Sequence, residues 1–181
     1  MFFLRKSNLE RLPVAMSGVR MGERALQIGI HDRSLAGAIA AKVGLSGHAA
    51  FAVASDDKAA QARSAGAAAG VLVDVQVSTL DTLPFAADAF DVVVVHAGDR
   101  SLPALDDSAG IPLLRESYRV LRIGGRIIVI EGGARGIAGV LRPRARRLDA
   151  AATVASLTTA GFRAARPLAE REGYRFTEGL K

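Results

Sequence analysis

Residues 25–35 read A-L-Q-I-G-I-H-D-R-S-L and decide the class of fold. Apolar side chains dominate residues 25–30, which predicts a buried strand, and Gly29 supplies the flexible backbone of a turn. Ser34 is a common helix-capping residue type, and the pattern after it predicts a helix to about residue 43. This order of elements begins many open α/β sheets, whose ligands lie across the carboxyl ends of the strands. The turn at Gly29 is therefore the first place to look for a functional site.

The rest of the chain repeats this alternation of strands and helices. Further strands are predicted at residues 48–54, 71–77, 90–96, 126–131, 162–169 and 174–177. Helices are predicted at residues 2–16, with a break at Pro13, at 56–64, with Asp56 or Asp57 as the cap, and at 111–121 and 148–159. Alternating elements predict right-handed crossovers and a parallel sheet, and the short turn at Glu172 and Gly173 requires an antiparallel strand at the end.

Two of these segments carry more detailed predictions. The valine-rich segment 71–77 is typical of a strand buried on both faces. Gly124 and Gly125 predict a tight turn that ends the helix at 111–121 before the strand at 126–131 begins.

The length and composition suit one domain with a hydrophobic core. The chain has 181 residues, of which 50% are hydrophobic, and we expect a single domain over residues 1–181, with an N-terminal helix in 1–18 and a core in 19–178. The absence of cysteine excludes disulfides and thiolate chemistry. A net charge of +6 leaves nucleic-acid binding open without favouring it. No apolar run is long enough to span a bilayer, so a soluble cytoplasmic protein is expected.

Two segments resemble a known family. The first is Leu83-Pro84-Phe85, followed by Asp88 and by Phe90-Asp91-Val92-Val93, and the second is L-R-E-S-Y-R-V-L-R-I-G-G-R at residues 114–126. They resemble the "LPF…FDVV" and "RE..RVL.PGG" segments of class I S-adenosylmethionine-dependent methyltransferases, of the type related to ubiquinone and menaquinone methyltransferases. The resemblance covers residues 19–178. It implies a Rossmann-like three-layer α/β/α sandwich with a mostly parallel seven-stranded sheet, order 3-2-1-4-5-7-6, and an antiparallel last strand.

The resemblance also implies S-adenosylmethionine as cofactor, in a modified pocket. Where the family has a D-x-G-x-G-x-G motif, this chain has Gln27, Gly29, His31 and Arg33. The acidic residue that holds the ribose in the family aligns with Ala54, and the aspartate that reaches the adenine aligns near Thr79. Asp56, Asp57 and Asp81 are possible substitutes, or ordinary helix-cap and loop residues. The implied cofactor pocket consists of Gly29, Ile30, His31, Ala54, Ser55, Thr79, Leu80 and His96.

Several side chains could contribute chemistry. His96 ends a predicted strand, so it is a candidate general base or cofactor contact, although a histidine satisfied by one hydrogen bond is the plainer interpretation. A metal site from His31, His96 and Asp99 is conceivable, but no local ligand spacing supports it. Five arginines between the last parallel strand and its helix could bind phosphate, an acidic acceptor or RNA, or form a solvated basic loop: Arg135, Arg142, Arg144, Arg146 and Arg147.

Two hypotheses about function follow. In the first, the chain is a methyltransferase that binds S-adenosylmethionine in an altered pocket and acts on a small molecule. In the second, it is a methyltransferase-like domain without cofactor binding that serves as a binding or assembly subunit. RNA methylation is a third possibility and requires the arginine-rich segment to flank the cleft. The first two differ in whether His31 and Arg33 fill the cleft.

Overall fold

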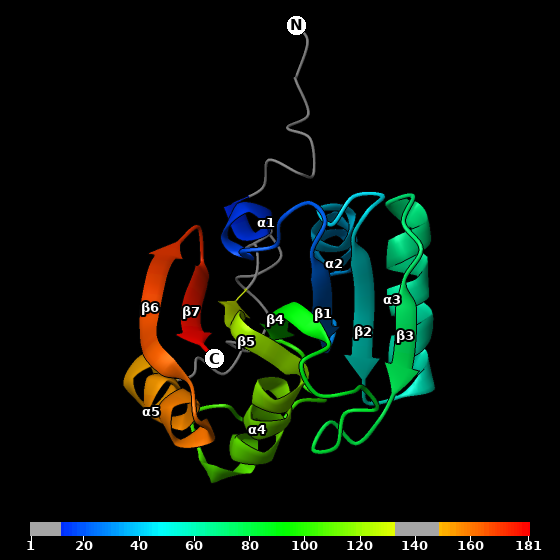
Figure 1. The fold of residues 1–181 in the computed structure, drawn as a ribbon. Coiled ribbons are helices and arrows are strands. Elements are labelled where there is room, and N and C mark those ends of the chain that lie inside the picture. Colours follow the sequence, from blue (N-terminus) through cyan, green and yellow to red (C-terminus); the bar gives the residue numbers. More distant parts are fainter. Residues whose placement is uncertain (1–11, 133–148) are drawn as a thin grey trace, which may run out of the picture.

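The structure is a computed structural model that describes residues 12–132 and 149–181. Seven strands form one sheet in the order β3-β2-β1-β4-β5-β7-β6, which runs from right to left in Figure 1. The strands are β1 (Arg24–Ile28), β2 (His48–Val53), β3 (Asp74–Val77), β4 (Phe90–His96), β5 (Leu121–Gly132), β6 (Arg163–Arg171) and β7 (Tyr174–Leu180). The helices are α1 (Leu12–Met16), α2 (Arg33–Ala41), α3 (Asp56–Ala68), α4 (Ile111–Val120) and α5 (Ala150–Ala160), with a 3-10 turn η2 (Ser108–Gly110).

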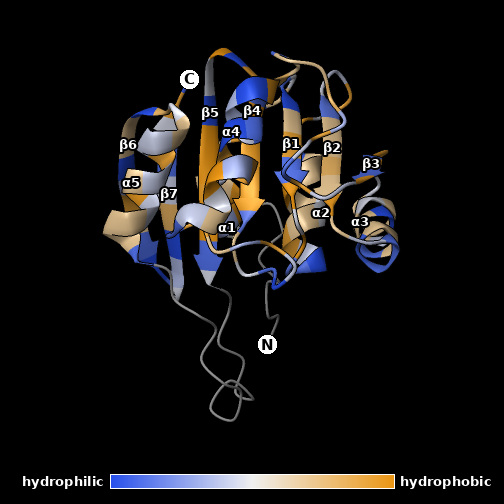
Figure 2. Cartoon of the chain, turned by 90° about the horizontal axis from the view of Figure 1, so that it is seen from below, coloured by the Kyte–Doolittle hydropathy of each residue, from blue (hydrophilic) through white to orange (hydrophobic). Residues whose placement is uncertain are grey.

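The strand directions confirm the predicted fold class. β1 pairs in parallel with β2 and β4, β2 with β3, and β4 with β5, whereas β7 is antiparallel to both β5 and β6. Successive residues of a strand face opposite sides of the sheet, so two hydrophobic layers form. Val92 and Val94 pack with α1, α2 and α3, whereas Val93 and Val95 pack with α4 and α5. In Figure 2 the hydrophobic residues gather in the central strands β4 and β5.

The helix caps differ from the prediction by one or two residues. Asp32, not Ser34, caps α2, because its carboxylate accepts a hydrogen bond from the Leu35 amide at 3.0 Å. Ser55, not Asp56 or Asp57, caps α3 by accepting from the Lys58 amide. The helix α3 also runs on to Ala68, past the predicted end at residue 64.

The predicted strand 71–77 is shorter and less buried than expected. β3 begins at Asp74 and ends at Val77, which is 44% exposed. It lies at the edge of the sheet and pairs only with β2, so the prediction of a strand buried on both faces is wrong. The valine content reflects strand propensity rather than burial.

Gly124 and Gly125 lie inside β5 rather than before it. The pairing of β4 with β5 moves from Phe90 opposite Leu121 to Val92 opposite Arg126, so the glycine turn is an irregularity within the strand. Gly124 has a φ of +75°, which a residue with a side chain rarely adopts.

The two predicted terminal elements have different outcomes. Of the predicted helix 2–16, the structure describes α1, Leu12–Met16, which contains Pro13. The rest of that helix lies outside the described residues, so the break at Pro13 stays a prediction. Glu172 and Gly173 join β6 and β7 as expected. In the described parts of the chain, no helix is long and apolar enough to cross a membrane.

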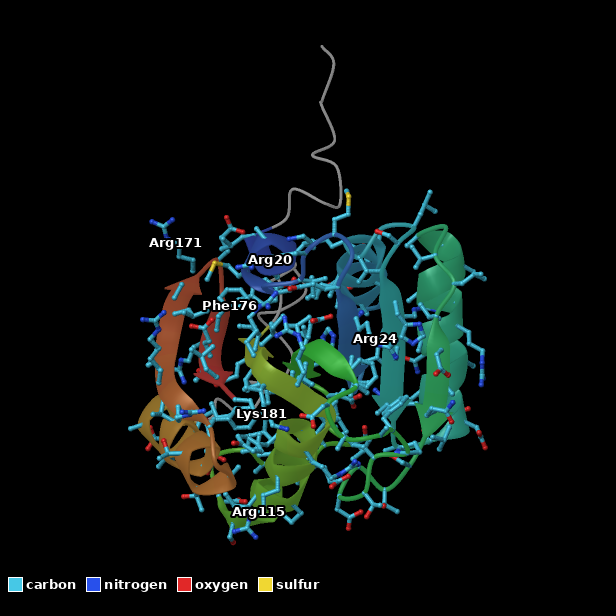
Figure 3. All side chains as sticks on the ribbon, viewed as in Figure 1. Arg20, Arg24, Arg115, Arg171, Phe176 and Lys181 are labelled. Atoms are coloured by element: carbon cyan, nitrogen blue, oxygen red, sulfur yellow. The ribbon has the colours of Figure 1, made fainter. Side chains whose placement is uncertain are left out.

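The two segments that carry the family resemblance lie against each other. Glu116, on α4, accepts a hydrogen bond from the Leu83 amide at 2.8 Å. Arg119, one turn later, donates to the carbonyls of Leu83 at 3.0 Å and Phe85 at 2.9 Å, and pairs with Glu116. Lys181, near the centre of Figure 3, donates to the Asp88 carboxylate at 2.9 Å. The loop before β4 is thereby fixed to α4.

Candidate functional site

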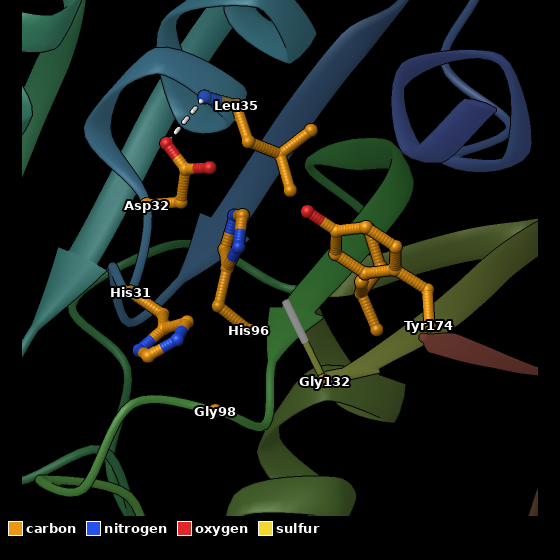
Figure 4. Close-up of a pocket in the computed structure, with 8 residues that line it drawn as sticks. His31, Asp32, Leu35, His96, Gly98, Gly132 and Tyr174 are labelled. Atoms are coloured by element: carbon orange, nitrogen blue, oxygen red, sulfur yellow. Dashed lines mark hydrogen bonds between the residues drawn. The ribbon is translucent and has the colours of Figure 1, made fainter. Parts of the chain in front are cut away.

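A small cavity lies at the carboxyl ends of the strands, where β1, β4, β5 and β7 meet. It is lined by His31, Asp32, Leu35, His96, Gly98, Ile130, Gly132 and Tyr174, most of them labelled in Figure 4. Its free volume is about 10 Å³, roughly the space that one water molecule needs. The Tyr174 hydroxyl points toward Leu35 and His96 (Figure 4). A substrate enters this cavity only if lining side chains move.

His96 is the last residue of β4 and is 2% exposed. Its Nε2 lies 2.8 Å from Oε1 of Gln27, and the amide nitrogen of Gln27 donates to the Ala36 carbonyl at 2.9 Å. Because that carbonyl can only accept, the orientation of the Gln27 amide is fixed and its oxygen must accept from His96. The hydrogen bond places the proton of His96 on Nε2, which leaves the lone pair on Nδ1.

Burial sets the charge of this histidine. Loss of hydration lowers the pKa of His96 to about 4, and the nearby Asp99 carboxylate opposes the change only in part. His96 is therefore neutral at pH 7. It is a buried residue at the end of β4 with a fixed tautomer, and its bond to Gln27 is the one hydrogen bond that the plainer sequence interpretation allows.

Asp99, in the loop after β4, is the most heavily bonded group at this edge. Its side chain is fully buried and accepts from the Ile30 amide at 2.7 Å and from both the amide and the hydroxyl of Ser101. Lys58 approaches it from α3 at 2.9 Å and also donates to the Ile30 carbonyl at 2.9 Å. Burial raises the pKa of Asp99, but the hydrogen bonds from Ile30, Lys58 and Ser101 outweigh it and lower the pKa overall.

The turn at Gly29 is covered by the loop after β4. Gly29 has a φ of +73°, and a Cβ placed there would lie 3.0 Å from Leu102 and 3.2 Å from Asp99. The ring of His31 lies over Gly98, whereas Arg33 is exposed and lines, together with His31 and Asp32, a groove between α2 and α3. Asp99 and Leu102, rather than His31 and Arg33 together, occupy the space above the glycine.

The predicted ribose and adenine positions lie along the same edge of the sheet. Ala54 follows β2 directly and is exposed, and Ser55 is occupied as the cap of α3. Thr79 is exposed and hydrogen-bonded to Asp81, and Leu80 is buried with a φ of 69°. The positions predicted for the ribose and the adenine thus lie at the carboxyl ends of β2 and β3, but residue 54 has no carboxylate.

Two other candidates from the sequence are the metal site of His31, His96 and Asp99 and the arginine-rich segment. Among the described residues, no three His, Asp or Glu side chains are grouped so as to hold a metal ion, and Asp99 is engaged with Lys58 and Ser101 instead. The five arginines from Arg135 to Arg147 lie outside the described residues.

The sequence patterns do not single out Lys58 or Tyr174 as site residues. The one signal for Lys58 is its place in the first turn of a helix, where a cation opposes the helix dipole. Tyr174 was visible only as a strand residue; its place in the cavity depends on β7 lying beside β5.

The sheet order, with its antiparallel seventh strand, and the ligand edge at β1 and β4 define the class I methyltransferase fold. The profile of the methyltransferase domain family matches residues 30–129, more than half of the 181. The ubiquinone/menaquinone biosynthesis C-methyltransferase UbiE of Ectopseudomonas mendocina is 34% identical over 124 residues, which are 67% of this chain and 46% of that protein. The chain belongs to the methyltransferase domain family, of the class that depends on S-adenosylmethionine.

Solved structures agree with this fold. A SAM-dependent methyltransferase from Aquifex aeolicus superposes with a TM-score of 0.73 at 15% identity, over 92% of this chain and 86% of that one. The structure of PigF with SAH gives a TM-score of 0.64 at 21% identity, over 88% of this chain and 51% of that one. The chain spans about half the length of the UbiE relative, so the activity of that whole protein does not transfer directly.

Part of the edge suits the cofactor of this family. S-adenosylmethionine carries a primary ammonium, and the Ile30 carbonyl and Asp99 carboxylate already hold one, that of Lys58. At the position predicted for the ribose diol, in contrast, Ala54 offers no acceptor in its side chain. The acceptor set therefore fits the amino-acid end of the cofactor better than its ribose.

Proposed function

We propose that this chain is an S-adenosylmethionine-dependent methyltransferase domain that acts on a small molecule. The observation that carries the proposal is the family match over residues 30–129, which begins at the turn after β1 and includes the carboxyl ends of β2, β3 and β4. The proposed cofactor wall consists of Gly29, Ile30, His31, Ala54, Ser55, Thr79 and Leu80, with His96 beside the acceptor.

The cofactor, when bound, supplies a methyl group on a sulfonium, which the acceptor attacks. The protein has to align the acceptor and exclude water, and a base is needed only when the acceptor loses a proton. In our proposal His96, neutral at pH 7, accepts a hydrogen bond or a proton from the acceptor at Nδ1. Because its pKa is about 4, it is a weak base that suits orientation more than abstraction of a strongly held proton.

A domain that no longer binds the cofactor is the second candidate. It is favoured by Asp99 and Leu102, which cover Gly29, and by the missing carboxylate at Ala54. Loss of a bidentate acceptor for the ribose costs about 1–3 kcal/mol, or roughly tenfold to hundredfold in affinity.

Calorimetric titration with S-adenosylhomocysteine separates the two candidates. Saturable micromolar binding supports the methyltransferase and leads to a screen of small acceptors for transfer of a labelled methyl group. No binding at millimolar ligand, either by the wild type or by Lys58→Met, which removes the ammonium from Asp99, contradicts it and favours the binding subunit. Steeply salt-dependent RNA binding would point instead to an RNA substrate.

A further inference from the structure

Lys58 is placed against its local preference. It is the third residue of α3, close to the positive end of the helix dipole, where Asp56 and Asp57 are favourable and a lysine is not. Its side chain reaches away from the helix to the turn after β1, where the ammonium meets the Ile30 carbonyl and the Asp99 carboxylate, each at 2.9 Å. The tertiary contact therefore explains the position of this charge.

The two acceptors form a site that does not depend on the lysine for its shape. The Asp99 carboxylate is held by the Ile30 amide at 2.7 Å and by the Ser101 amide and hydroxyl at 3.0 and 2.9 Å. Its side chain is fully buried, whereas that of Lys58 is 24% exposed. The acceptors are thus fixed, and the cation is the part that can leave.

The lysine also lies across the ligand edge of the sheet. It joins α3, which follows β2, to the turn after β1 and the loop after β4. Asp99 and Leu102 lie directly over Gly29. A ligand that crosses the carboxyl ends of β1 and β2 near Gly29 therefore meets Lys58 in its path.

We propose that the Ile30 carbonyl and the Asp99 carboxylate form a binding site for a ligand's primary ammonium, which Lys58 occupies as a tethered competitor until the ligand displaces it. The inference rests on the proposed function, because S-adenosylmethionine and S-adenosylhomocysteine both carry such an ammonium. When a competitor holds the site most of the time, the apparent Kd of the ligand equals its intrinsic Kd divided by the fraction of protein in which the site is open. A site open in about 1% of molecules weakens binding about a hundredfold.

The first test uses a cation with no relation to the cofactor. Lys58→Met removes the ammonium and keeps an apolar stem, and Asp99 retains its three other hydrogen bonds. In ¹⁵N-labelled protein, n-propylammonium is expected to shift the Ile30 and Ser101 amide signals saturably in Lys58→Met and not in the wild type. n-Propanol, which is uncharged, should not shift them.

Two variants serve as controls for this test. Lys42→Met removes a lysine at the end of α2, whose ammonium donates to the Val14 carbonyl far from the edge, and should behave as the wild type. Lys58→Met combined with Asp99→Asn should lose the n-propylammonium response. If Lys58→Met does not fold, Lys58→Ala, which also has no side-chain donor, provides the vacancy. An n-propylammonium response absent from every folded Lys58 variant overturns the site.

The second test asks whether the cofactor uses the site. S-adenosylhomocysteine is compared by calorimetry with 5′-methylthioadenosine, which has the nucleoside but no ammonium. Lys58→Met is expected to bind S-adenosylhomocysteine at least tenfold more tightly than the wild type, with no gain for 5′-methylthioadenosine. An equal gain for both ligands overturns ammonium recognition, and a loss of affinity shows instead that Lys58 binds the ligand carboxylate.

The two tests separate this inference from the proposed function. If n-propylammonium binds Lys58→Met but no variant binds S-adenosylhomocysteine, the ammonium site stands and the methyltransferase proposal falls. If S-adenosylhomocysteine binds all variants equally and n-propylammonium binds none, the methyltransferase proposal stands and this inference falls.

Discussion

At the scale of single residues, His96 makes the stability of the protein depend on pH. Its pKa is about 4 in the folded protein and 6.5 when unfolded, so the unfolded chain binds more protons between these values. Stability therefore falls as the pH is lowered from 6.5 to 4, by up to about 3 kcal/mol from this group. Urea denaturation at a series of pH values from 7 to 4 measures the change.

Two variants show whether His96 causes that dependence. His96→Gln keeps a side-chain N–H that can donate to Gln27 but cannot titrate, so the fall in stability between pH 6.5 and 4 should be smaller by most of that amount. His48→Gln, at the start of β2, removes a less buried histidine and should retain the wild-type profile. Parallel profiles for the wild type and His96→Gln would contradict the assignment.

Ala54 carries a second prediction at this scale. Ala54→Asp places a carboxylate at the end of β2, on an exposed residue where its charge stays hydrated, and offers the ribose diol a bidentate acceptor. S-adenosylhomocysteine should bind roughly tenfold to hundredfold more tightly than to the wild type by calorimetry. Ala60→Asp adds the same charge on an exposed position of α3 and should change nothing. Equal affinities for all three proteins would exclude a ribose site beside residue 54.

The sequence located the edge of the site but not its contacts. Gly29 and His96 could be placed because each stands at the end of a strong strand pattern, and parallel strands end at one edge. The Lys58–Asp99 pair joins residues 41 positions apart, and the Gln27–His96 bond joins residues 69 apart. No local pattern records which of several charged side chains meet across such distances, so these contacts required the structure.

At the scale of elements, Arg119 makes several of the hydrogen bonds that join α4 to the loop before β4. Arg119 donates to the Leu83 and Phe85 carbonyls and to Glu116, whose other role is to accept from the Leu83 amide. Arg119→Met removes these donors and should lower the free energy of unfolding by about 2 kcal/mol. Arg115→Met, on an exposed position of the same helix, should lower it by under about 0.5 kcal/mol. Urea denaturation of both variants checks the difference, and equal losses would contradict it.

The sequence predicts the bounds of some strands and misses those of others. The pattern predicts β4 to the residue, because four consecutive valines, Val92–Val95, lie between the polar Asp91 and His96. β3 was predicted too long, since valines favour a strand without stating whether a second strand lies beside it. Gly124 and Gly125 predict a turn before the strand, but the shifted pairing of β4 with β5 accommodates them inside β5.

At the scale of the whole molecule, different contacts stabilise the two ends of the parallel strands. At the amino ends, the Asp91 carboxylate accepts a hydrogen bond from the Arg24 amide at 2.7 Å, and Arg126 forms an ion pair with Glu23 at 2.7 Å. At the carboxyl ends, the partly exposed side chain of Lys58 lies across the ends of β1 and β4. In our proposal, the cation at the carboxyl ends is the one that an entering ligand displaces.

Lys181 is a single side chain that could hold β7 against β5 and α4. Its ammonium donates to the Leu121 carbonyl at 2.6 Å, to the Asp88 carboxylate at 2.9 Å and lies over the Tyr118 ring, so it joins the end of β7 to α4 and β5. Lys181→Met should lower the free energy of unfolding by about 2 kcal/mol and Tm by roughly 5 °C, measured by calorimetry. Arg171→Met, at the exposed end of β6, removes a charge of the same sign and should leave Tm within about 1 °C of the wild type. If Lys181→Met melts with Arg171→Met, the packing of β7 on β5 holds that half without the lysine.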